Sequence, residues 1–287
     1  MKNIFRKFFY SGDWHIAIIK GGDIHCIDNT KGFWFADPFL FKQGDVTYLF
    51  VEAFNKKKEL GSIGYLDSNS TYKKFKILLE NKTHFSYPNV FSVNQDIYII
   101  PENGEAGGVF LYKFQSFPSS VVLIDKMLIG NYVDTSIVKI MNQTLFMVSY
   151  NADNHTLVLI KYDLETHNIE IIDTIIDSDK TLRPAGNAFC KQGQVFLPFQ
   201  FSTNKYGEKI VVRSVVFSQT SFQLGEIVYE ISKDIFNLKK VDRIHTLNYL
   251  NENQFVIDYM KEHFSLFKPF RMLRRLIRRK KHSRITK

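Results

Sequence analysis

Short apolar runs alternate with polar turns along most of the chain. The runs are rich in Phe, Val, Ile and Tyr and are separated by Gly, Asn and Asp, a pattern typical of β-strands joined by tight turns. Clear examples are FADPFLF (35–41), VTYLFVE (46–52), DIYIIPE (96–102), TLFMVSY (144–150) and QVFLPFQ (194–200). Long helical periodicity is absent before the C-terminal tail. The pattern therefore predicts an all-β body.

An internal repeat organises these strands. Each unit has a leading residue at the start of one strand and a trailing residue, usually polar, 13 to 17 positions later in the next. The leading residues lie 50, 47, 49 and 62 positions apart: Asp37, Tyr87, Asp134, Arg183 and His245. The trailing residues are Glu52, Glu102, Ser149, Gln200 and Asp258.

A period near fifty residues, with about four short strands per unit, is the signature of a β-propeller. Five units predict a five-bladed β-propeller over residues 1–262. The run WHIAII (14–19) has no partner in its own unit, so we expect it to complete the last blade and close the ring, which removes open sheet edges. A β-sandwich is the competing architecture, but it would not explain the constant spacing of the motifs.

The spacing also predicts where the leading residues meet. A turn at Gly44-Asp45 places Asp37 roughly opposite Glu52, and a turn at Asn94-Gln95 places Tyr87 roughly opposite Glu102. Opposed residues share one face of a hairpin, with Cβ atoms ~5 Å apart. If each leading strand is the innermost strand of its blade, these side chains converge on an axial cavity.

Carboxylates, an arginine and a histidine gathered at one point are typical of sites that handle sugars. Paired carboxylates act as acid, base or nucleophile at an anomeric carbon, where positive charge develops. We therefore predict that Asp37, Glu102 and Glu52 are catalytic. The predicted substrate-binding residues are an aromatic ring for stacking, a cation for anionic groups and their polar neighbours: Tyr87, Asp134, Arg183, His245 and Gln200.

The same residues have a structural interpretation, because Asp and His at strand starts often bond neighbouring blades. A repeat kept only for packing would tend to keep one residue type, whereas the leading position varies from unit to unit. This variation favours function. His84, just before SYPNVF, is a further residue that could reach the cavity.

Composition separates a neutral body from a basic tail. The chain of 287 residues has 38 Lys and Arg against 29 Asp and Glu, a formal net charge of +9. Ten of the basic residues follow position 267, where no acidic residue occurs, so residues 1–267 have 28 basic and 29 acidic residues and a formal charge of −1. The excess charge therefore belongs to the tail and not to the predicted site.

The tail, residues 263–287, is predicted to be a basic amphipathic helix. In FKPFRMLRRLIRRKK, Phe270, Leu273 and Ile277 fall on one face and arginines on the other, as in a helix that lies on a membrane surface. We expect residues 268–287 to bind an anionic membrane. Nucleic acid is the rival partner for a basic tail, but the neutral body contains no nucleic-acid-binding module.

Other sequence features concern the compartment and cofactors. No apolar run is long enough to span a bilayer, and charged residues interrupt the first twenty residues, unlike a secretory signal. Cys26 and Cys190 fit no metal or redox spacing, so we expect two buried thiols in a reducing compartment. We expect a cytoplasmic protein, peripheral to the inner face of the cell membrane. No motif for a metal or cofactor occurs, so neither is predicted.

Several ordered motifs carry a family resemblance. FADPFLF with YLFVE, SYPNVF with IIPE, RPAGNAF and RIHTLN resemble the N-terminal domain of glucosamine inositolphosphorylceramide transferase-like proteins, over residues 14–260. ADPF also resembles the first-blade motif of glycoside hydrolase family forty-three. That resemblance implies that Asp37 is a general base and that Glu102 is the nearest candidate for the general acid. The second aspartate of those hydrolases is replaced here by Tyr87, which argues against ordinary hydrolysis.

Three functions remain open from the sequence. The first is a glycan-active enzyme of surface polysaccharide or glycolipid synthesis, which transfers a glycosyl group at the cytoplasmic membrane face to or from a saccharide or lipid-linked glycan. The second is a non-catalytic carbohydrate-binding propeller that assists a glycosyltransferase. The third is a glycoside hydrolase.

Overall fold

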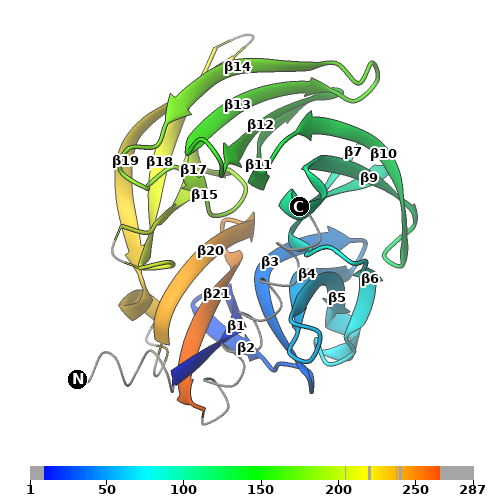
Figure 1. Cartoon of the computed structure of the whole chain (residues 1–287), viewed down its shortest axis with the longest axis vertical. Coiled ribbons are helices and arrows are strands. Elements are labelled where there is room, and N and C mark those ends of the chain that lie inside the picture. The colour runs from blue at the N-terminus through cyan, green and yellow to red at the C-terminus, as the bar shows by residue number, and fades with distance from the viewer. Residues whose placement is uncertain (1–9, 204, 219–220, 237, 239–240, 266–287) are drawn as a thin grey trace, which may run out of the picture.

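The computed structural model of the chain is a ring of five antiparallel sheets, so the predicted five-bladed β-propeller is confirmed (Figure 1). It describes residues 10–265 except 204, 219–220, 237 and 239–240. Within this part of the chain, no helix is long and apolar enough to cross a membrane. The predicted tail helix lies outside the described residues and stays a prediction.

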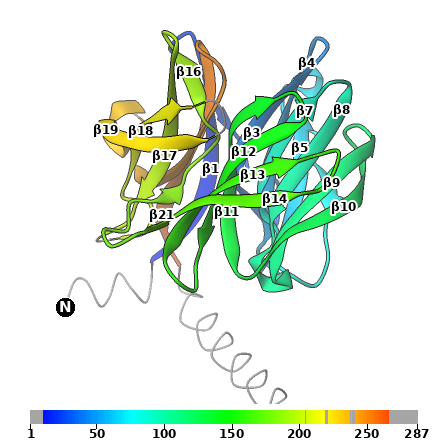
Figure 2. The same cartoon turned by 90° about the horizontal axis from the view of Figure 1, so that it is seen from above.

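Blades 1 to 4 are each built from consecutive strands. Blade 1 contains β3 (Phe33–Gln43), β4 (Val46–Asn55), β5 (Leu60–Asp67) and β6 (Lys76–Leu79). Blade 2 contains β7 (Ser86–Val93), β8 (Asp96–Glu102), β9 (Gly108–Ser116) and β10 (Ser120–Ile129). Blade 3, seen side-on in Figure 2, contains β11 (Tyr132–Met141), β12 (Thr144–Asn151), β13 (Thr156–Asp163) and β14 (Ile169–Ile176). Blade 4 contains β15 (Arg183–Pro184), β16 (Phe189–Lys191), β17 (Gln194–Phe201), β18 (Lys209–Phe217) and β19 (Phe222–Ser232). Short 3-10 turns complete the order: η1 (Ser68–Ser70), η2 (Gly104–Ala106) and η3 (Lys233–Phe236).

Blade 5 joins the two ends of the described chain. Its strands are β20 (Val241–Asn251), β21 (Gln254–Phe264), β1 (Tyr10–Lys20) and β2 (Asp23–Ile27), in that order across the sheet. β1 pairs with β21 along its whole length, from Tyr10 opposite Phe264 to Lys20 opposite Gln254. The predicted closure of the ring by residues 14–19 is therefore confirmed.

The core is divided into five apolar clusters, one at each interface between adjacent blades. Alternation along β1 shows how one strand serves two interfaces. Ile16 and Ile18 pack toward blade 1, whereas Ala17 and Ile19 pack toward blade 4. Because both faces of a blade are covered, its strands are apolar at consecutive positions, which explains runs such as WHIAII.

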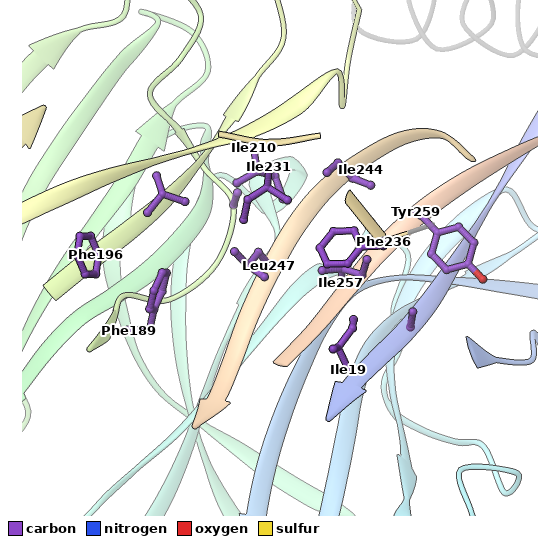
Figure 3. Close-up of a cluster of buried hydrophobic side chains, with 13 residues drawn as sticks. Ile19, Phe189, Phe196, Ile210, Ile231, Phe236, Ile244, Leu247, Ile257 and Tyr259 are labelled. Carbon is purple, nitrogen blue, oxygen red and sulfur yellow. The ribbon is translucent and has the colours of Figure 1, made fainter. Parts of the chain in front are cut away.

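Figure 3 shows the cluster between blades 4 and 5. Leu247 and Ile257 of blade 5 face Ile210 and Phe196 of blade 4, and Phe236 of η3 covers the edge. Leu247, Ile257 and Ile210 have no exposed surface. Burial of each such side chain contributes about 1.5–3 kcal/mol, so this interface stabilises the blade that closes the ring.

The two cysteines are an exception to the predicted core. Both Cys26 and Cys190 are free and exposed, so the prediction of buried thiols is wrong. Cys26 lies on β2, the outermost strand of blade 5, and Cys190 lies on the three-residue β16. Neither strand is covered on both faces, so apolar neighbours in sequence do not bury these side chains.

Candidate active site

The five leading residues all lie near the start of the innermost strand of a blade. Asp37, Tyr87 and Asp134 follow the beginnings of β3, β7 and β11, Arg183 opens β15, and His245 lies in β20. The innermost strands β3, β7, β11, β15 and β20 surround the axis (Figure 1). Contacts between leading residues of neighbouring blades show that their side chains lie close together.

A β-bulge turns the leading residue in four of the five blades. In blade 1, Ala36 pairs with Glu52 and Phe39 with Phe50, so Asp37 and Pro38 together oppose one residue. The predicted pairing of Asp37 with Glu52 is thus displaced by one position. Equivalent bulges occur at Tyr87, Asp134 and His245, whereas Arg183 pairs with Gln200 without one.

Three of these bulges use a left-handed backbone. The φ angles of Asp37, Tyr87 and Asp134 are 48°, 47° and 51°. This region is strained for non-glycine residues and is found where surrounding structure enforces it. A positive φ angle at the same position of three blades indicates that the fold turns these three side chains toward one place.

Asp37 is held by groups from the blades on either side of it. His245 Nε2 of blade 5 lies 3.2 Å from Asp37 Oδ1, and the N–H of Tyr87 in blade 2 donates to Asp37 Oδ2 at 3.3 Å. Asp258 on β21 accepts the N–H of Asp37 at 3.0 Å. The Asp37 carboxylate therefore has a fixed position between three blades.

Asp258 also fixes His245. It has no exposed surface, and its Oδ1 accepts the N–H groups of His245 at 3.2 Å and Thr246 at 3.0 Å. Its Oδ2 lies 2.7 Å from His245 Nδ1, an ion-pair contact without the alignment of a good hydrogen bond. Burial alone would lower the pKa of His245, but Asp258 and Asp37 raise it to about 10. His245 is therefore an imidazolium between two carboxylates.

Aromatic rings surround that cation. Trp14 of β1 lies against the imidazole with a centroid distance of 4.1 Å and an interplanar angle of 31°. Tyr206, after β17, meets it edge-on at 5.1 Å. A cation against an aromatic face is stabilised by the ring quadrupole.

A second network joins blades 2, 3 and 4. Arg183 Nε donates to Asp134 Oδ2, and Gln200 Nε2 donates to the same oxygen at 3.1 Å. The N–H of Asp134 donates to Glu102 Oε2 at 3.2 Å, and Arg183 lies 3.9 Å from that oxygen. Asp134 is buried, whereas the Arg183 side chain is 33% exposed. Arg183 thus combines a buried anchor with a partly exposed side chain.

Glu102 has the protonation behaviour of an acid. Burial and the nearby charge of Asp134 raise the pKa of Glu102 to about 8, although Arg183 opposes the shift. The carboxyl group therefore carries a proton near neutral pH, while Asp37 lies against the His245 cation. A carboxyl group that stays protonated near neutral pH can act as a proton donor.

Glu52 is paired with His84, the residue predicted to reach the cavity. His84 Nε2 lies 3.2 Å from Glu52 Oε1, and the N–H of Gly61 donates to His84 Nδ1 at 3.1 Å. Burial would lower the pKa of His84, but Glu52 raises it to about 9. Protonation of His84 at Nδ1 would break the bond from the N–H of Gly61, so that bond opposes the effect of Glu52. Burial raises the pKa of Glu52 as well.

Tyr87 differs from the stacking platform expected from its position. Its side chain is fully buried, its hydroxyl lies 2.6 Å from Ser136 Oγ, and its ring packs edge-on against Phe39. It offers no open ring face to a ligand. The half-buried Trp34, stacked on Phe54 at 4.4 Å, is a more accessible aromatic group of blade 1.

The sequence did not predict that Trp14 and Tyr206 pack against His245, or that Asp258 bonds both Asp37 and His245. Asp258 carried a signal, since it is the trailing residue of the fifth unit. Trp14 carried none, because its contact with His245 depends on the closure of the ring.

Among the described residues, one cluster of side chains could hold a cation. Asp37, His245 and Asp258 offer ligand atoms within 4.8 Å of one another, and all three are buried. His245, however, itself bridges both carboxylates. An ion and the imidazolium would therefore compete for the same oxygens.

Residues 24–256 match the family model described as "Glucosamine inositolphosphorylceramide transferase 1, N-terminal". Two curated relatives are named Glucosamine inositolphosphorylceramide transferase 1. The Oryza sativa subsp. indica protein is 32% identical over 206 residues, 64% of this chain and 27% of the relative. The Arabidopsis thaliana protein is 38% identical over 106 residues, 36% of this chain and 14% of the relative. The matched region therefore spans about a quarter or less of these longer proteins.

Solved structures with the same fold include glycoside hydrolases. The catalytic domain of a Coprinopsis cinerea GH62 α-L-arabinofuranosidase aligns with a TM-score of 0.60 and 11% identity, over 88% of this chain and 97% of that one. An exo-β-1,3-galactanase from Phanerochaete chrysosporium aligns with a TM-score of 0.60 and 11% identity, over 88% and 64%. At this identity the likeness shows the fold alone.

Proposed function

Because this chain belongs to the family of glucosamine inositolphosphorylceramide transferase 1 N-terminal domains, we propose that it transfers a glycosyl group in the synthesis of a surface polysaccharide or glycolipid. The observation that carries the proposal is the different electrostatic setting of Asp37 and Glu102, two carboxyl groups that influence each other electrostatically. Asp37 lies against the His245 cation, whereas Glu102 is half-buried and its raised pKa of about 8 keeps it protonated near neutral pH.

These settings assign roles to both carboxyl groups. Asp37 takes the proton of an acceptor hydroxyl while the oxygen of that hydroxyl bonds to the anomeric carbon of the donor sugar. The bond from that carbon to the leaving oxygen breaks, and Glu102 gives that oxygen its proton. Arg183 holds an anionic part of donor or acceptor, because its planar guanidinium matches phosphate or carboxylate. Glu52, next to His84, is the second carboxyl group beside Asp37.

A non-catalytic carbohydrate-binding propeller is the second candidate. It is favoured because the buried carboxylates of the site are already hydrogen-bonded within the protein. Asp134 accepts from Arg183 and Gln200, and Asp258 accepts three backbone N–H groups. A network of this kind holds a ligand rigidly without any proton transfer.

The experiment incubates the purified chain with nucleotide-activated sugars, including glucosamine, and with inositolphosphorylceramide or oligosaccharide acceptors. Product analysis distinguishes transfer, release of free sugar as in a hydrolase, and binding without turnover. We expect transfer, with losses of about 10²–10⁴-fold in Asp37→Asn and Glu102→Gln.

The matched control is Glu170→Gln, which changes an exposed carboxylate on β14. Full activity of Asp37→Asn would contradict the assignment of the base. Binding with no turnover on any donor would favour the second candidate.

Location at the cytoplasmic membrane face is part of the proposal. It is supported by the ten basic residues and apolar stripe of residues 268–287, which suit an anionic lipid surface. A tail bound there would keep the propeller near a lipid-linked glycan.

A further inference from the structure

Three asparagine side chains form a hydrogen-bonded network close to the leading residues. They are Asn89 of β7, Asn187 between β15 and β16, and Asn248 of β20. Each follows the leading residue of its own blade by two to four positions. Asn89 and Asn248 are buried, and Asn187 is half-buried. The proposed proton transfers use none of the three, so their polar groups have another role.

The first part of the network is a reciprocal pair of amides. Asn89 Nδ2 donates to Asn187 Oδ1 at 2.7 Å, and Asn187 Nδ2 donates to Asn89 Oδ1 at 2.8 Å. Asn89 belongs to blade 2 and Asn187 to blade 4, and blade 3 separates these blades in the ring. Two short side chains from them can meet only at the axis. The amide pair therefore bridges the axis.

The same two amides bond the innermost strand of blade 3. Asn89 Nδ2 also donates to the carbonyl oxygen of Thr135 at 3.0 Å. Asn187 Oδ1 also accepts the N–H of Ile137 at 2.7 Å. Thr135 directly follows the leading residue Asp134 on β11. The amide pair thus fixes the backbone next to Asp134.

Asn248 extends the network to blades 5 and 1. The N–H of Asn187 donates to Asn248 Oδ1 at 2.8 Å, and Asn248 Nδ2 donates to the carbonyl oxygen of Pro38 at 2.9 Å. Pro38 directly follows Asp37, and Asn248 lies three positions after His245. This side chain therefore joins the two backbone segments that carry Asp37 and His245.

Asparagine suits this position because its amide both donates and accepts hydrogen bonds. Buried polar groups are nearly always paired, so each amide has a defined orientation once its partners are in place. Apolar side chains could fill the same space, but their attraction has no preferred direction. A satisfied network of amides instead fixes how one blade lies relative to the others.

The candidate active site requires such alignment, because its contacts join different blades. His245 Nε2 of blade 5 lies 3.2 Å from Asp37 Oδ1 of blade 1, and Arg183 of blade 4 bonds Asp134 of blade 3. The clusters that pack the blades together are apolar. A displacement of about 1 Å at a reacting group can slow a reaction about 100-fold, so small movements between blades matter.

We propose that Asn89, Asn187 and Asn248 are positioning residues, which hold the leading residues of the five blades in the geometry of the proposed glycosyl transfer. The expected effect on transfer rests on the proposed function. The alignment of His245 with Asp37 through Asn248 does not, because it can be measured without any substrate.

The test replaces Asn248 by alanine in the full chain and follows the His245 ring by NMR titration. The ring lies between the carboxylates of Asp37 and Asp258. Loss of the bond to Pro38 should let Asp37 move away from the imidazolium. The pKa of His245 should then fall from about 10 to about 9, since an opposite charge within ~4–6 Å shifts a pKa by roughly 1–3. In transfer assays, kcat should fall about tenfold or more, with KM within about twofold.

Asn251→Ala is the matched control, because Asn251 is an exposed asparagine of the same strand whose side chain accepts the N–H of Asn253 in a turn. It should leave the titration and the kinetics unchanged. Thermal unfolding verifies the fold of each variant. If Asn248→Ala does not fold, Asn248→Ser, which keeps one hydroxyl group for hydrogen bonding, is measured in its place with the same expected direction.

The proposal is overturned if His245 titrates in the folded Asn248 variant as it does in the unchanged protein. A lowered pKa of His245 in a chain that transfers no sugar would support the positioning role and contradict the proposed function alone. Failure of the positioning role is therefore distinguishable from failure of the proposed function.

Discussion

At the scale of single residues, Asp258 connects two blades of the ring through its buried carboxylate. It has no exposed surface and accepts backbone N–H groups from Asp37, His245 and Thr246. Since Asp37 and His245 come from different blades, one carboxylate fixes the relative position of these two residues. Asp258 is therefore a positioning residue for the proposed chemistry.

Asp258→Asn should destabilise the fold by about 3 kcal/mol at pH 6, because a buried cation loses a partner. The pKa of His245 should also fall below about 10. A raised histidine pKa stabilises the fold fully below its ordinary value near 6.5, and this contribution is lost as pH rises through about 10. NMR titration of His245 and urea unfolding at pH 6 and 9 measure both effects.

The control for that substitution is Asp96→Asn, which removes an exposed partner of Lys113 and should cost at most about 1 kcal/mol. An unchanged titration of His245 in Asp258→Asn would show that Asp37 alone holds the proton on the imidazole.

Glu102 also loses its contribution to stability as pH rises, over a lower pH range than His245. Its pKa of about 8 exceeds the ordinary value of 4.5, so its contribution to stability is present below pH 4.5 and is lost as pH rises through 8. Glu102→Gln should therefore gain stability relative to the unchanged protein between pH 5 and 8.5. Urea unfolding at those two values checks this, with Glu170→Gln as control; a pH-independent difference would mean that Glu102 is ionised throughout.

At the scale of elements, the contact between blades 4 and 5 depends on one glycine. Gly186 has a φ of 149°, and a Cβ there would lie 2.0 Å from the carbonyl oxygen of Leu247. Nearby, the N–H of Leu247 donates to the carbonyl of Ala185 at 2.7 Å. The two backbones approach too closely for any side chain.

Gly186→Ala should therefore reduce the free energy of unfolding by about 2–4 kcal/mol. Gly193→Ala is the matched control, since Gly193 also has a positive φ, 77°, but has open space around it. It should cost about 1 kcal/mol from backbone strain alone. Equal losses in the two variants, measured by urea unfolding, would exclude the clash with Leu247 as the cause.

The elements also show what the sequence could and could not predict. The repeat predicted five blades, and the two-residue turn at Gly44-Asp45 is as expected, with Gln43 paired to Val46. The bulges were not predictable, because a left-handed backbone at Asp37 or Tyr87 is enforced by surrounding structure and has no local signal such as glycine. They displaced the expected pairings by one residue, yet Asp37 still influences Glu52 electrostatically.

At the scale of the whole molecule, the separation of charge leads to a prediction about membranes. Replacement of four tail arginines by glutamine should weaken binding to phosphatidylserine vesicles several hundred-fold, at about 1 kcal/mol per basic residue. The four are Arg274, Arg275, Arg278 and Arg279. Cosedimentation with anionic and with neutral vesicles provides the measurement.

The control replaces four exposed lysines of the propeller body instead: Lys31, Lys57, Lys73 and Lys74. Equal loss of binding from both sets would mean that total charge, and not the tail, governs attraction to the vesicle.

Closure of the ring has a consequence for the order in which the protein matures during synthesis. Blades 1 to 4 are made of consecutive strands, so each can fold soon after it leaves the ribosome. Blade 5 cannot, because β1 must wait for β21, and Trp14 must wait for His245. A nascent chain that stops before β20 would contain four blades and most of the carboxylates, but no imidazolium to face Asp37. The proposed chemistry at the axis would therefore become available only when translation has passed β21.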